Sequence, residues 1–403
     1  MKLNRLLLFP CIAILLNSSL FAEDEKEKKF PANQWVALAK TKVVIPEIWN
    51  KGRHKGINSF GSEVYCEKLG LVLSLDGYTT APAGKSTPNN YSESMYGFNP
   101  ITTELTLIKR NNWQGGARST DPKKCSYPLD ENKTEPTPCP RHTYNGICYS
   151  NDSGKFYLIN GANAGVPNAH PKFKINGGTG VYTFWEYDVE TKKWKELDYP
   201  GVKRKEPYDT LLRPMLGDNS LYLIQVWSLW KYDLKTNKWT GLKKHTGRPL
   251  NSGSKGCHST VDPIRKRILI FNSAARLRKG KTETEAHKMV NLRYYDVATD
   301  AFVQIPLKGA VEGKIKAGIA YVDHMDCYAV RTEKGLFLYF PKEKKWKKPE
   351  IKQFIPKARK PFSWTYLNYD SKRKLLILNR YAVLNLDPKT LKLTDLKVEP
   401  VTK

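Results

Sequence analysis

Residues 229–242 read LWKYDLKTNKWTGL, and residues 184–197 read FWEYDVETKKWKEL. Each stretch holds an aromatic residue, an aspartate directly after it, a threonine three positions later and a tryptophan three positions after that. A third copy runs from Tyr295 through Asp296 and Thr299 to Phe302. A spacing that recurs in this way indicates a repeated supersecondary unit.

Three weaker copies keep the same frame, in which the first and last positions are seven residues apart. They run from Phe98 to Leu105, from Tyr339 to Trp346 and from Leu386 to Leu393. We interpret each copy as a β-hairpin, because Asp or Asn accepts hydrogen bonds from a turn backbone and aromatic residues favour strands. Short apolar runs such as KFYLING and SLYLIQV precede the copies, and turn-like stretches such as VDPIRK precede most of those runs. This order predicts four strands per unit.

A four-stranded unit of roughly 45 residues is typical of β-propellers. We therefore predict an all-β fold, a propeller of six four-stranded antiparallel blades, with seven blades as the alternative. A β-sandwich with fortuitously similar turns is the rival fold. The stretch NQWVAL at residues 33–38 matches NKWTGL at residues 237–242. We expect this N-terminal strand to dock against the closing blade, which LKLTDL at residues 391–396 is already expected to complete.

The repeat resembles that of the kelch, or galactose-oxidase-like, propeller family. The likeness rests on the Y-D-x-x-T-x-x-W copies and on Pro140-Arg141-His142, which is similar to a blade entry of that family. It covers most of residues 33–398. The repeats are degenerate and the double glycine of the family is missing, with Asp76-Gly77 and Asn160-Gly161 as the nearest remnants.

The N-terminus has the pattern of a secretory signal peptide. A basic MKLNR precedes the apolar run LLLFPCIAILL, and a small residue follows at Ala22. The run is too short to span a bilayer. We therefore expect residues 1–22 to be a signal peptide cleaved near Ala22, residues 23–32 a charged linker and residues 33–403 a single propeller domain. The mature chain is predicted to be secreted or periplasmic, without a membrane span.

The chain is strongly basic, with a formal net charge of +28. Removing residues 1–22 deletes Lys2 and Arg5 and no acid, so 28 − 2 leaves +26. Such a field attracts polyanions. For an exported protein this favours an acidic polysaccharide or a cell-surface protein as partner and does not indicate specific nucleic-acid binding. We expect a monomer.

Six cysteines follow the signal peptide, an even number that permits disulfides in an oxidising compartment. Sequence does not choose among the possible pairings. Cys125 and Cys139 are the strongest pair because they bracket a polar, proline-rich stretch. No cysteine or histidine spacing indicates a structural zinc site, and no metal site is predicted.

Long intervals separate the predicted strands at residues 77–93, 109–142, 161–182 and 272–291. The second interval joins two blades, and the others fall between second and third strands. In a propeller all such connections emerge on one face. Long connections in compact domains usually serve function. The sequence therefore predicts a functional face that carries these segments.

Candidate ligand-binding residues are basic or aromatic and lie at blade entries or on these long connections. They are Arg53, His54, Trp113, Arg118, Arg141, His142, His170, Lys172, Arg213, His258, Arg276, Arg278, Lys316 and Arg359. We expect these residues to hold an anionic glycan or a protein partner.

The alternative function is an enzyme acting on an acidic polysaccharide at the same face. A lyase or hydrolase would use Arg141 to neutralise a carboxylate and His142 or His258 as a base. A copper-radical oxidase, which the resemblance allows, would need two His and two Tyr at the axis. His142 and His258 are present, but no spacing singles out a set. We predict no cofactor, with copper the alternative.

Overall fold

The computed structural model describes residues 29–38, 42–44, 62–75, 95–109, 137–138, 141, 143–161, 182–200, 210–225, 228–242, 257–272, 291–311, 318–332, 334–352, 366–379 and 381–398. The chain divides into two compact units, Met1–Phe30 and Pro31–Lys403. Of the first unit only Lys29 and Phe30 are described, so the predicted signal peptide and most of the predicted linker lie outside the described residues.

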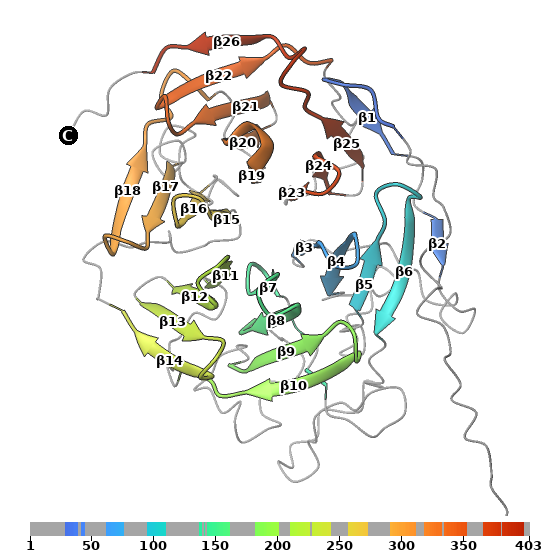
Figure 1. Ribbon diagram of the computed structural model, residues 1–403, viewed down its shortest axis with the longest axis vertical. Coiled ribbons are helices and arrows are strands. Elements are labelled where there is room, and N and C mark those ends of the chain that lie inside the picture. The colour runs from blue at the N-terminus through green and yellow to red at the C-terminus, as the bar shows by residue number, and fades with distance from the viewer. Residues whose placement is uncertain are drawn as a thin grey trace, which may run out of the picture. The chain divides into compact units, whose positions relative to one another are not determined.

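The described strands of the second unit form a six-bladed β-propeller (Figure 1). Blade 1 contains β3 (Glu63–Cys66), β4 (Leu71–Leu75), β5 (Met95–Phe98) and β6 (Glu104–Lys109). Blade 2 contains β7 (Ile147–Ser150), β8 (Lys155–Ile159), β9 (Phe184–Asp188) and β10 (Lys193–Leu197). Blade 3 contains β11 (Thr210–Met215), β12 (Ser220–Gln225), β13 (Leu229–Asp233) and β14 (Lys238–Gly241).

The remaining three blades follow the same antiparallel order. Blade 4 contains β15 (Cys257–Asp262), β16 (Arg267–Asn272), β17 (Asn291–Asp296) and β18 (Ala301–Ile305). Blade 5 contains β19 (Gly318–Val322), β20 (Cys327–Thr332), β21 (Gly335–Phe340) and β22 (Lys345–Pro349). Blade 6 contains β23 (Leu367–Asp370), β24 (Leu375–Leu378), β25 (Ala382–Asn385) and β1 (Trp35–Ala37). The prediction of six blades is confirmed among the described residues.

The first strand of each blade lies innermost. The innermost strands contact one another around the whole ring, in the order β3, β7, β11, β15, β19, β23 and back to β3 (Figure 1). This closed circuit shows that the blades form a ring. Because every blade runs outward from the axis in the same strand order, equivalent strand ends lie on the same rim of that ring.

In blades 1 to 5 the repeated sequence forms the hairpin between the third and fourth strands, whereas the sixth copy, from Leu386 to Leu393, leads from blade 6 to a strand of blade 5. In blade 3, Asp233 Oδ1 accepts hydrogen bonds from the backbone N–H groups of Lys235 and Thr236, both at 2.8 Å. Asn237 then takes a left-handed backbone conformation, with φ of 56°, before the chain returns. Asp188, Asp296 and Asn99 accept the corresponding pair of N–H groups in their own blades. The repeated acid is thus a turn-forming residue.

The repeated aromatic residues pair across the two strands of that hairpin. Tyr232 lies opposite Trp239 with their ring centroids 4.9 Å apart, and Tyr187 and Trp194 show the same distance. These pairs join apolar clusters shared by neighbouring blades, one of which contains Tyr232, Phe184 and Tyr157 from blades 3 and 2. Burial of large aromatic surfaces between the sheets explains why the repeat keeps its seven-residue spacing.

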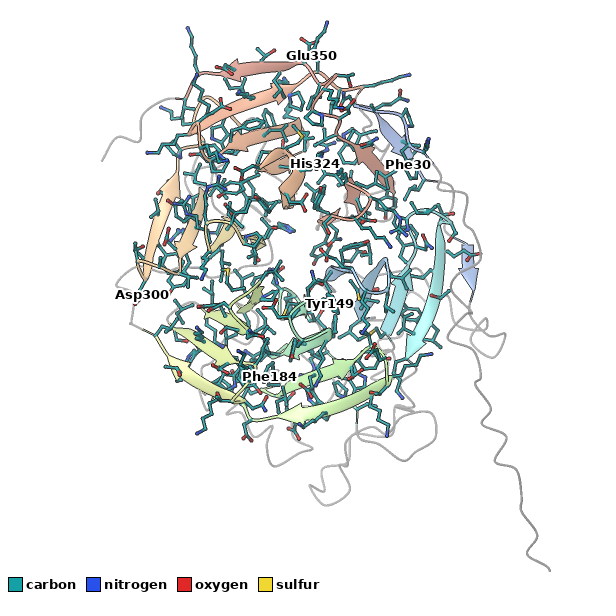
Figure 2. All side chains as sticks on the ribbon, in the orientation of Figure 1. Phe30, Tyr149, Phe184, Asp300, His324 and Glu350 are labelled. Carbon is teal, nitrogen blue, oxygen red and sulfur yellow. The ribbon has the colours of Figure 1, made fainter. Side chains whose placement is uncertain are left out.

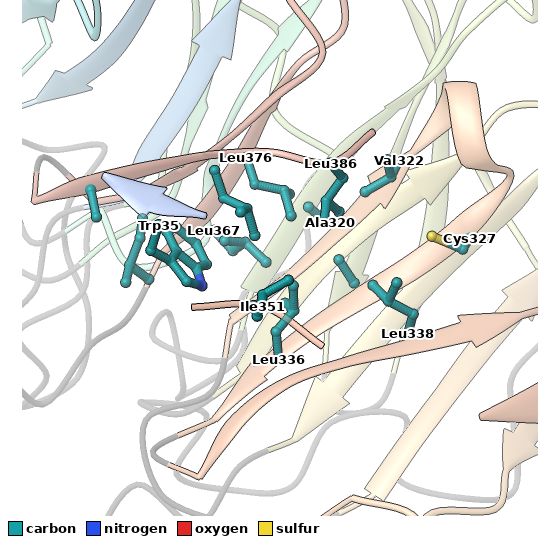
Figure 3. Close-up of a cluster of buried hydrophobic side chains, with 14 residues drawn as sticks. Trp35, Ala320, Val322, Cys327, Leu336, Leu338, Ile351, Leu367, Leu376 and Leu386 are labelled. Carbon is teal, nitrogen blue, oxygen red and sulfur yellow. The ribbon is translucent and has the colours of Figure 1, made fainter. Parts of the chain in front are cut away.

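The N-terminal strand closes the ring. β1 is the outermost strand of blade 6, where Trp35 pairs with Leu384 and is only 4% exposed. Trp35 packs in the cluster that blade 6 shares with blade 5, near Ile351, Leu367 and Leu376 (Figure 3). The expected docking of this strand on the closing blade is confirmed.

The expectation that LKLTDL completes the last blade is wrong. Its strand, β26 (Leu393–Leu396), instead pairs antiparallel with β22 and becomes a fifth strand of blade 5. Asp395 there pairs with Lys345 at 3.3 Å. Because β1 already occupies the outer position of blade 6, the final strand pairs with the neighbouring edge.

Among the described cysteines, Cys66, Cys148 and Cys327 are buried and form no disulfide. The predicted bridge between Cys125 and Cys139 lies outside the described residues. No helix in the described part of the chain has the length and apolar character needed to cross a membrane.

Candidate functional site

The two rims of the ring differ in the length of their connections. On one rim, short turns join the first strand of a blade to the second and the third strand to the fourth. Four turns between first and second strands have four residues each: 151–154, 216–219, 263–266 and 371–374. We call this the short-turn rim. The opposite rim carries the strand ends to which residues 76–94, 110–146, 160–183 and 273–290 attach. We call this the long-loop rim. The strand bounds thus assign all four long connections to one rim, as expected.

Three of the predicted ligand-binding residues lie in the described part of the chain: Arg141, Arg213 and His258. The other eleven lie outside it, namely Arg53, His54, Trp113, Arg118, His142, His170, Lys172, Arg276, Arg278, Lys316 and Arg359. The structure therefore brings none of those eleven into a described site.

Arg141 lies at the base of a long connection. It is completely buried, and its Nη1 donates to the Asn160 carbonyl oxygen at 3.2 Å and to Thr183 Oγ1 at 2.8 Å. Asn160 and Thr183 are the first and last residues between β8 and β9. The guanidinium of Arg141 thus fixes the two ends of the connection.

Arg213 joins three blades close to the axis. From β11 it donates to the carbonyl oxygens of Asn145 at 3.3 Å and Ile147 at 3.1 Å on the blade 2 side. Its Nε donates to the Ser259 carbonyl oxygen in blade 4 at 3.4 Å. The half-buried guanidinium is therefore engaged in holding the innermost strands together, which is a structural use of a residue predicted to bind ligand.

His258 is an uncharged side chain in the interior. It is 4% exposed, and its ring meets that of Tyr366 edge to face with the centroids 5.5 Å apart. Burial, with the nearby positive charge of Arg213 as a second cause, lowers the pKa of His258 to about 3. At neutral pH this histidine therefore supplies no positive charge to an anionic ligand and is a weak base.

A cavity of about 240 Å³ lies on the axis, lined by innermost strands and first turns of all six blades. Tyr149 of β7 is part of its wall (Figure 2). Its charged and amide-bearing residues are Glu63, Glu67, Asn151, Arg213, Asp323 and Asn368. First-turn residues such as Glu67 and Asp323 belong to the short-turn rim, which places the cavity at that end of the axis. Three carboxylates against one guanidinium make its wall unsuited to an anion.

Sequence reasoning missed this cavity. The candidates predicted from the sequence lie at blade entries and on long connections, which belong to the other rim. The signal that was present is an acidic residue at or just beyond the ends of the first strands, as at Glu67 and Asp323. Acidic residues are common in turns, so this signal does not by itself indicate a site.

The charged side chains of the short-turn rim bind one another across blades. Arg265 in blade 4 donates to Asp262 at 2.9 Å and to both carboxylate oxygens of Asp326 in blade 5, at 2.7 and 2.6 Å. Asp262 is fully buried and also accepts the hydroxyl of Tyr328 in blade 5 at 2.6 Å. Hydrogen bonds from Arg265 lower the pKa of Asp326 to about 2. This network connects two adjacent blades.

Equivalent contacts join other blades on the same rim. Asp152 in blade 2 accepts the backbone N–H groups of Gly217 and Asn219 in blade 3, at 2.9 and 3.2 Å. Ser371 in blade 6 donates to Glu67 in blade 1 at 2.5 Å. The short-turn rim therefore uses its polar groups to hold the ring together.

At the described base of the long-loop rim, polar side chains bind both within a blade and between blades. Asn272 Nδ2 donates to Asn291 Oδ1 at 2.9 Å, across the ends of the interval at residues 273–290. Like Arg141, this pair closes a connection within one blade. Between blades, Asn160 Nδ2 donates to Thr210 Oγ1 of blade 3 at 3.1 Å, and the Ser62 N–H donates to Thr143 Oγ1 at 3.1 Å. These contacts form a fixed base from which the connections start.

No group of three or more His, Cys, Asp or Glu side chains in the described residues is arranged to hold a metal ion. Of the two histidines considered for copper, only His258 is described, and His142 lies outside. Comparison with known proteins gives no match to any family model and none to a curated protein.

Proposed function

We propose that this chain is an exported binding propeller of the kelch-like type that recognises an anionic glycan or a protein partner on its long-loop rim. The observation that carries the proposal is the assignment of every long interval between described strands to that rim, while the turns between first and second strands on the other rim stay short. Long connections raised on a rigid scaffold are the usual carriers of recognition.

The charge of the connecting segments supports an anionic ligand. Residues 243–256, between β14 and β15, contain Lys243, Lys244, Arg248 and Lys255 and no acid. Residues 353–365 also hold only cations: Lys357, Arg359 and Lys360. A rim bearing such segments attracts polyanions and accelerates their encounter.

Export supports a glycan or a cell-surface partner as the available ligand. The basic start, apolar run and small residue at Ala22 support cleavage of residues 1–22. The polyanions outside a cell include acidic polysaccharides, which offer carboxylate or sulfate groups to lysine and arginine side chains.

The test is an array of neutral, carboxylated and sulfated glycans probed with the mature protein at low and high salt. Retention of anionic glycans at low salt that weakens as salt rises supports the proposal. Incubation of the best ligands with the protein, followed by analysis of chain length, separates binding from cleavage. Lack of retention of every anionic glycan at low salt would refute the anionic-glycan proposal, and shortened products would show an enzyme instead.

A further inference from the structure

The outer edges of the blades offer a second surface that the proposed function does not use. The fourth strand of each blade is outermost, so one of its edges faces away from the sheet. In the described residues the chain covers two of these edges itself. β2 (Lys42–Val44) pairs parallel with β6 in blade 1, and β26 pairs antiparallel with β22 in blade 5. The blades of this protein therefore accept a fifth strand.

Most other outermost strands carry features that discourage further pairing. β10 has the sequence KWKEL and β14 has KWTG, so both present lysine along the edge. β1 is only three residues long. Lysine side chains and short length are two common ways of protecting a sheet edge.

β18 lacks these protections. Its sequence AFVQI has no charged residue and no proline, and no described strand pairs with its outer edge (Figure 1). Val303 is 39% exposed, and Gln304 is also exposed. Among the outermost strands of the described ring, β18 is the one with five residues and no charge.

β18 is also held in an extended conformation before any partner arrives. Val303 lies opposite Tyr294, and Phe302 lies opposite Tyr295 with the ring centroids 5.3 Å apart. Just beyond its end, the Pro306 carbonyl oxygen accepts the indole N–H of Trp346 in blade 5 at 2.8 Å. A preformed edge lowers the entropy lost when a strand is added.

A second copy of the chain fits this edge poorly. Five residues extend only about 17 Å, which is enough to pair with one extended segment but short for an interface between two folded copies, since such interfaces bury about 1,200–2,000 Å². Two copies would also bring together chains of net charge +28, which repel each other. Charge complementarity instead favours a partner with net negative charge.

We propose that the outer edge of β18 binds an extended segment of an acidic partner protein as the fifth strand of blade 4. Main-chain hydrogen bonds give such a complex its affinity, and alternate side chains give its specificity. Tyr294 and Val303 are register partners, so an apolar residue of the partner strand beside Val303 would continue this row of apolar side chains. Arg293 and Gln304 are also register partners, and a carboxylate of the partner strand beside Gln304 would continue this polar row. In blade 5, Asp395 of the added strand makes the same kind of contact with Lys345.

The probe is the peptide Ac-Glu-Glu-Val-Thr-Val-Thr-Val-Glu-Glu-NH₂, with a Lys-flanked peptide of the same core as its charge control. Binding is followed by fluorescence anisotropy of a labelled peptide and by amide hydrogen exchange of β18. Protection of alternate β18 amides by the Glu-flanked peptide is expected. The substitution Val303→Glu adds a charge of the same sign as the peptide to the edge and is expected to weaken binding at least about tenfold.

Thr240→Glu is the matched control, because it adds the same charge to the exposed edge strand β14 in the neighbouring blade. It should leave peptide affinity within about twofold. Unchanged thermal midpoints would show that both variants are folded. Neither substitution should alter glycan retention on the long-loop rim, which keeps this proposal separable from the proposed function.

Equal binding by wild type and Val303→Glu, or protection of amides outside β18, would overturn the proposal. Lack of protection at millimolar peptide would also overturn it. A dimer in sedimentation velocity that Val303→Glu dissociates would show that a second copy occupies the edge instead.

Discussion

Both rims of the ring have polar contacts between blades, and the long-loop rim also has side chains that bind the two ends of a long connection to each other. On the short-turn rim, side chains such as Arg265 and Asp152 bind groups in the next blade and hold the ring together. At the base of the long-loop rim, Arg141 and Asn272 bind groups within their own blade and fix where a connection begins and ends. The long-loop rim therefore both joins blades, as Asn160 does through Thr210 of blade 3, and fixes the ends of its long connections.

The largest effect on stability is expected from Arg265→Ala on the short-turn rim. The change leaves Asp262, a fully buried carboxylate, without its cation and also releases Asp326. Removing one partner of a buried ion pair costs about 3–5 kcal/mol. Urea unfolding should show this loss.

The matched control is Lys342→Ala, which removes a cation 3.3 Å from the same Asp326 carboxylate, but from a side chain that is 79% exposed. Exposed pairs contribute at most about 1 kcal/mol. Similar losses in the two variants would contradict the distinction between buried network and surface charge.

A smaller loss is expected from Arg141→Ala at the base of the long-loop rim. The substitution removes the donor to Asn160 and Thr183 and leaves buried acceptors, at a cost of about 2 kcal/mol. Because Arg141 fixes both ends of one connection, glycan retention should weaken as well. Urea unfolding and the glycan assay measure the two effects. Full stability with normal retention would show that Arg141 does not position the connection.

The contact between Asp326 and Arg265 on the short-turn rim should make stability depend on pH. Its folded pKa, about 2, lies below the ordinary value of 3.8 because of Arg265. A carboxyl group with a lowered folded pKa contributes stability above its unfolded pKa and loses it as pH falls toward the folded value. The difference between these two pKa values corresponds to about 2.4 kcal/mol, and solvent screening of the partly exposed carboxyl reduces the contribution to about 1–2 kcal/mol.

The variant Asp326→Asn reports this contribution directly. Wild type should exceed the variant in unfolding free energy at about pH 6, and the difference should shrink steadily between about pH 4 and pH 2. Unfolding curves across this range provide the measurement. A difference that is constant with pH would show that the charge of Asp326 does not stabilise the junction.

The smallest effect on stability is expected from shortening a connection of the long-loop rim. Replacing residues 275–288 with a Gly-Ser pair keeps Asn272 and Asn291, which close the base. Loop-closure entropy changes slowly with length, so stability should shift by no more than about 1 kcal/mol. Retention of anionic glycans should fall, because Arg276, Arg278, Lys279, Lys281 and Lys288 are removed. Loss of cooperative unfolding would mean that this segment holds the ring together.

Much of the fold was predictable because its signals are local. Asp233 accepts hydrogen bonds from residues two and three positions later, and its equivalents do the same. The spacing of the repeat can therefore be recognised within eight consecutive residues. The matching of NQWVAL to a fourth strand was enough to place β1 in the closing blade.

Other features depend on contacts between distant parts of the chain. The pattern of LKLTDL suits an outer strand in blade 5 as well as one in blade 6, so sequence did not distinguish the two edges. Nothing next to Arg141 in sequence shows that its partner Thr183 lies across a long connection. The carboxylates of the axial cavity come together only when the six first strands form a ring.

The central claim is that ligand binds the long-loop rim and not the short-turn rim. The most direct test compares two variants that lose the same charge. One replaces Lys243, Lys244, Arg248 and Lys255, between β14 and β15, with glutamine. The other replaces exposed lysines of the short-turn rim with glutamine: Lys235, Lys344, Lys372 and Lys374. Affinity for an anionic glycan identified by the array is then measured for both.

Because the net charge changes equally, any difference between the variants reports on position and not on the overall field. We predict that the long-loop variant loses about tenfold in affinity while the short-turn variant stays close to wild type. Equal losses in the two variants, or a loss confined to the short-turn variant, would contradict the claim.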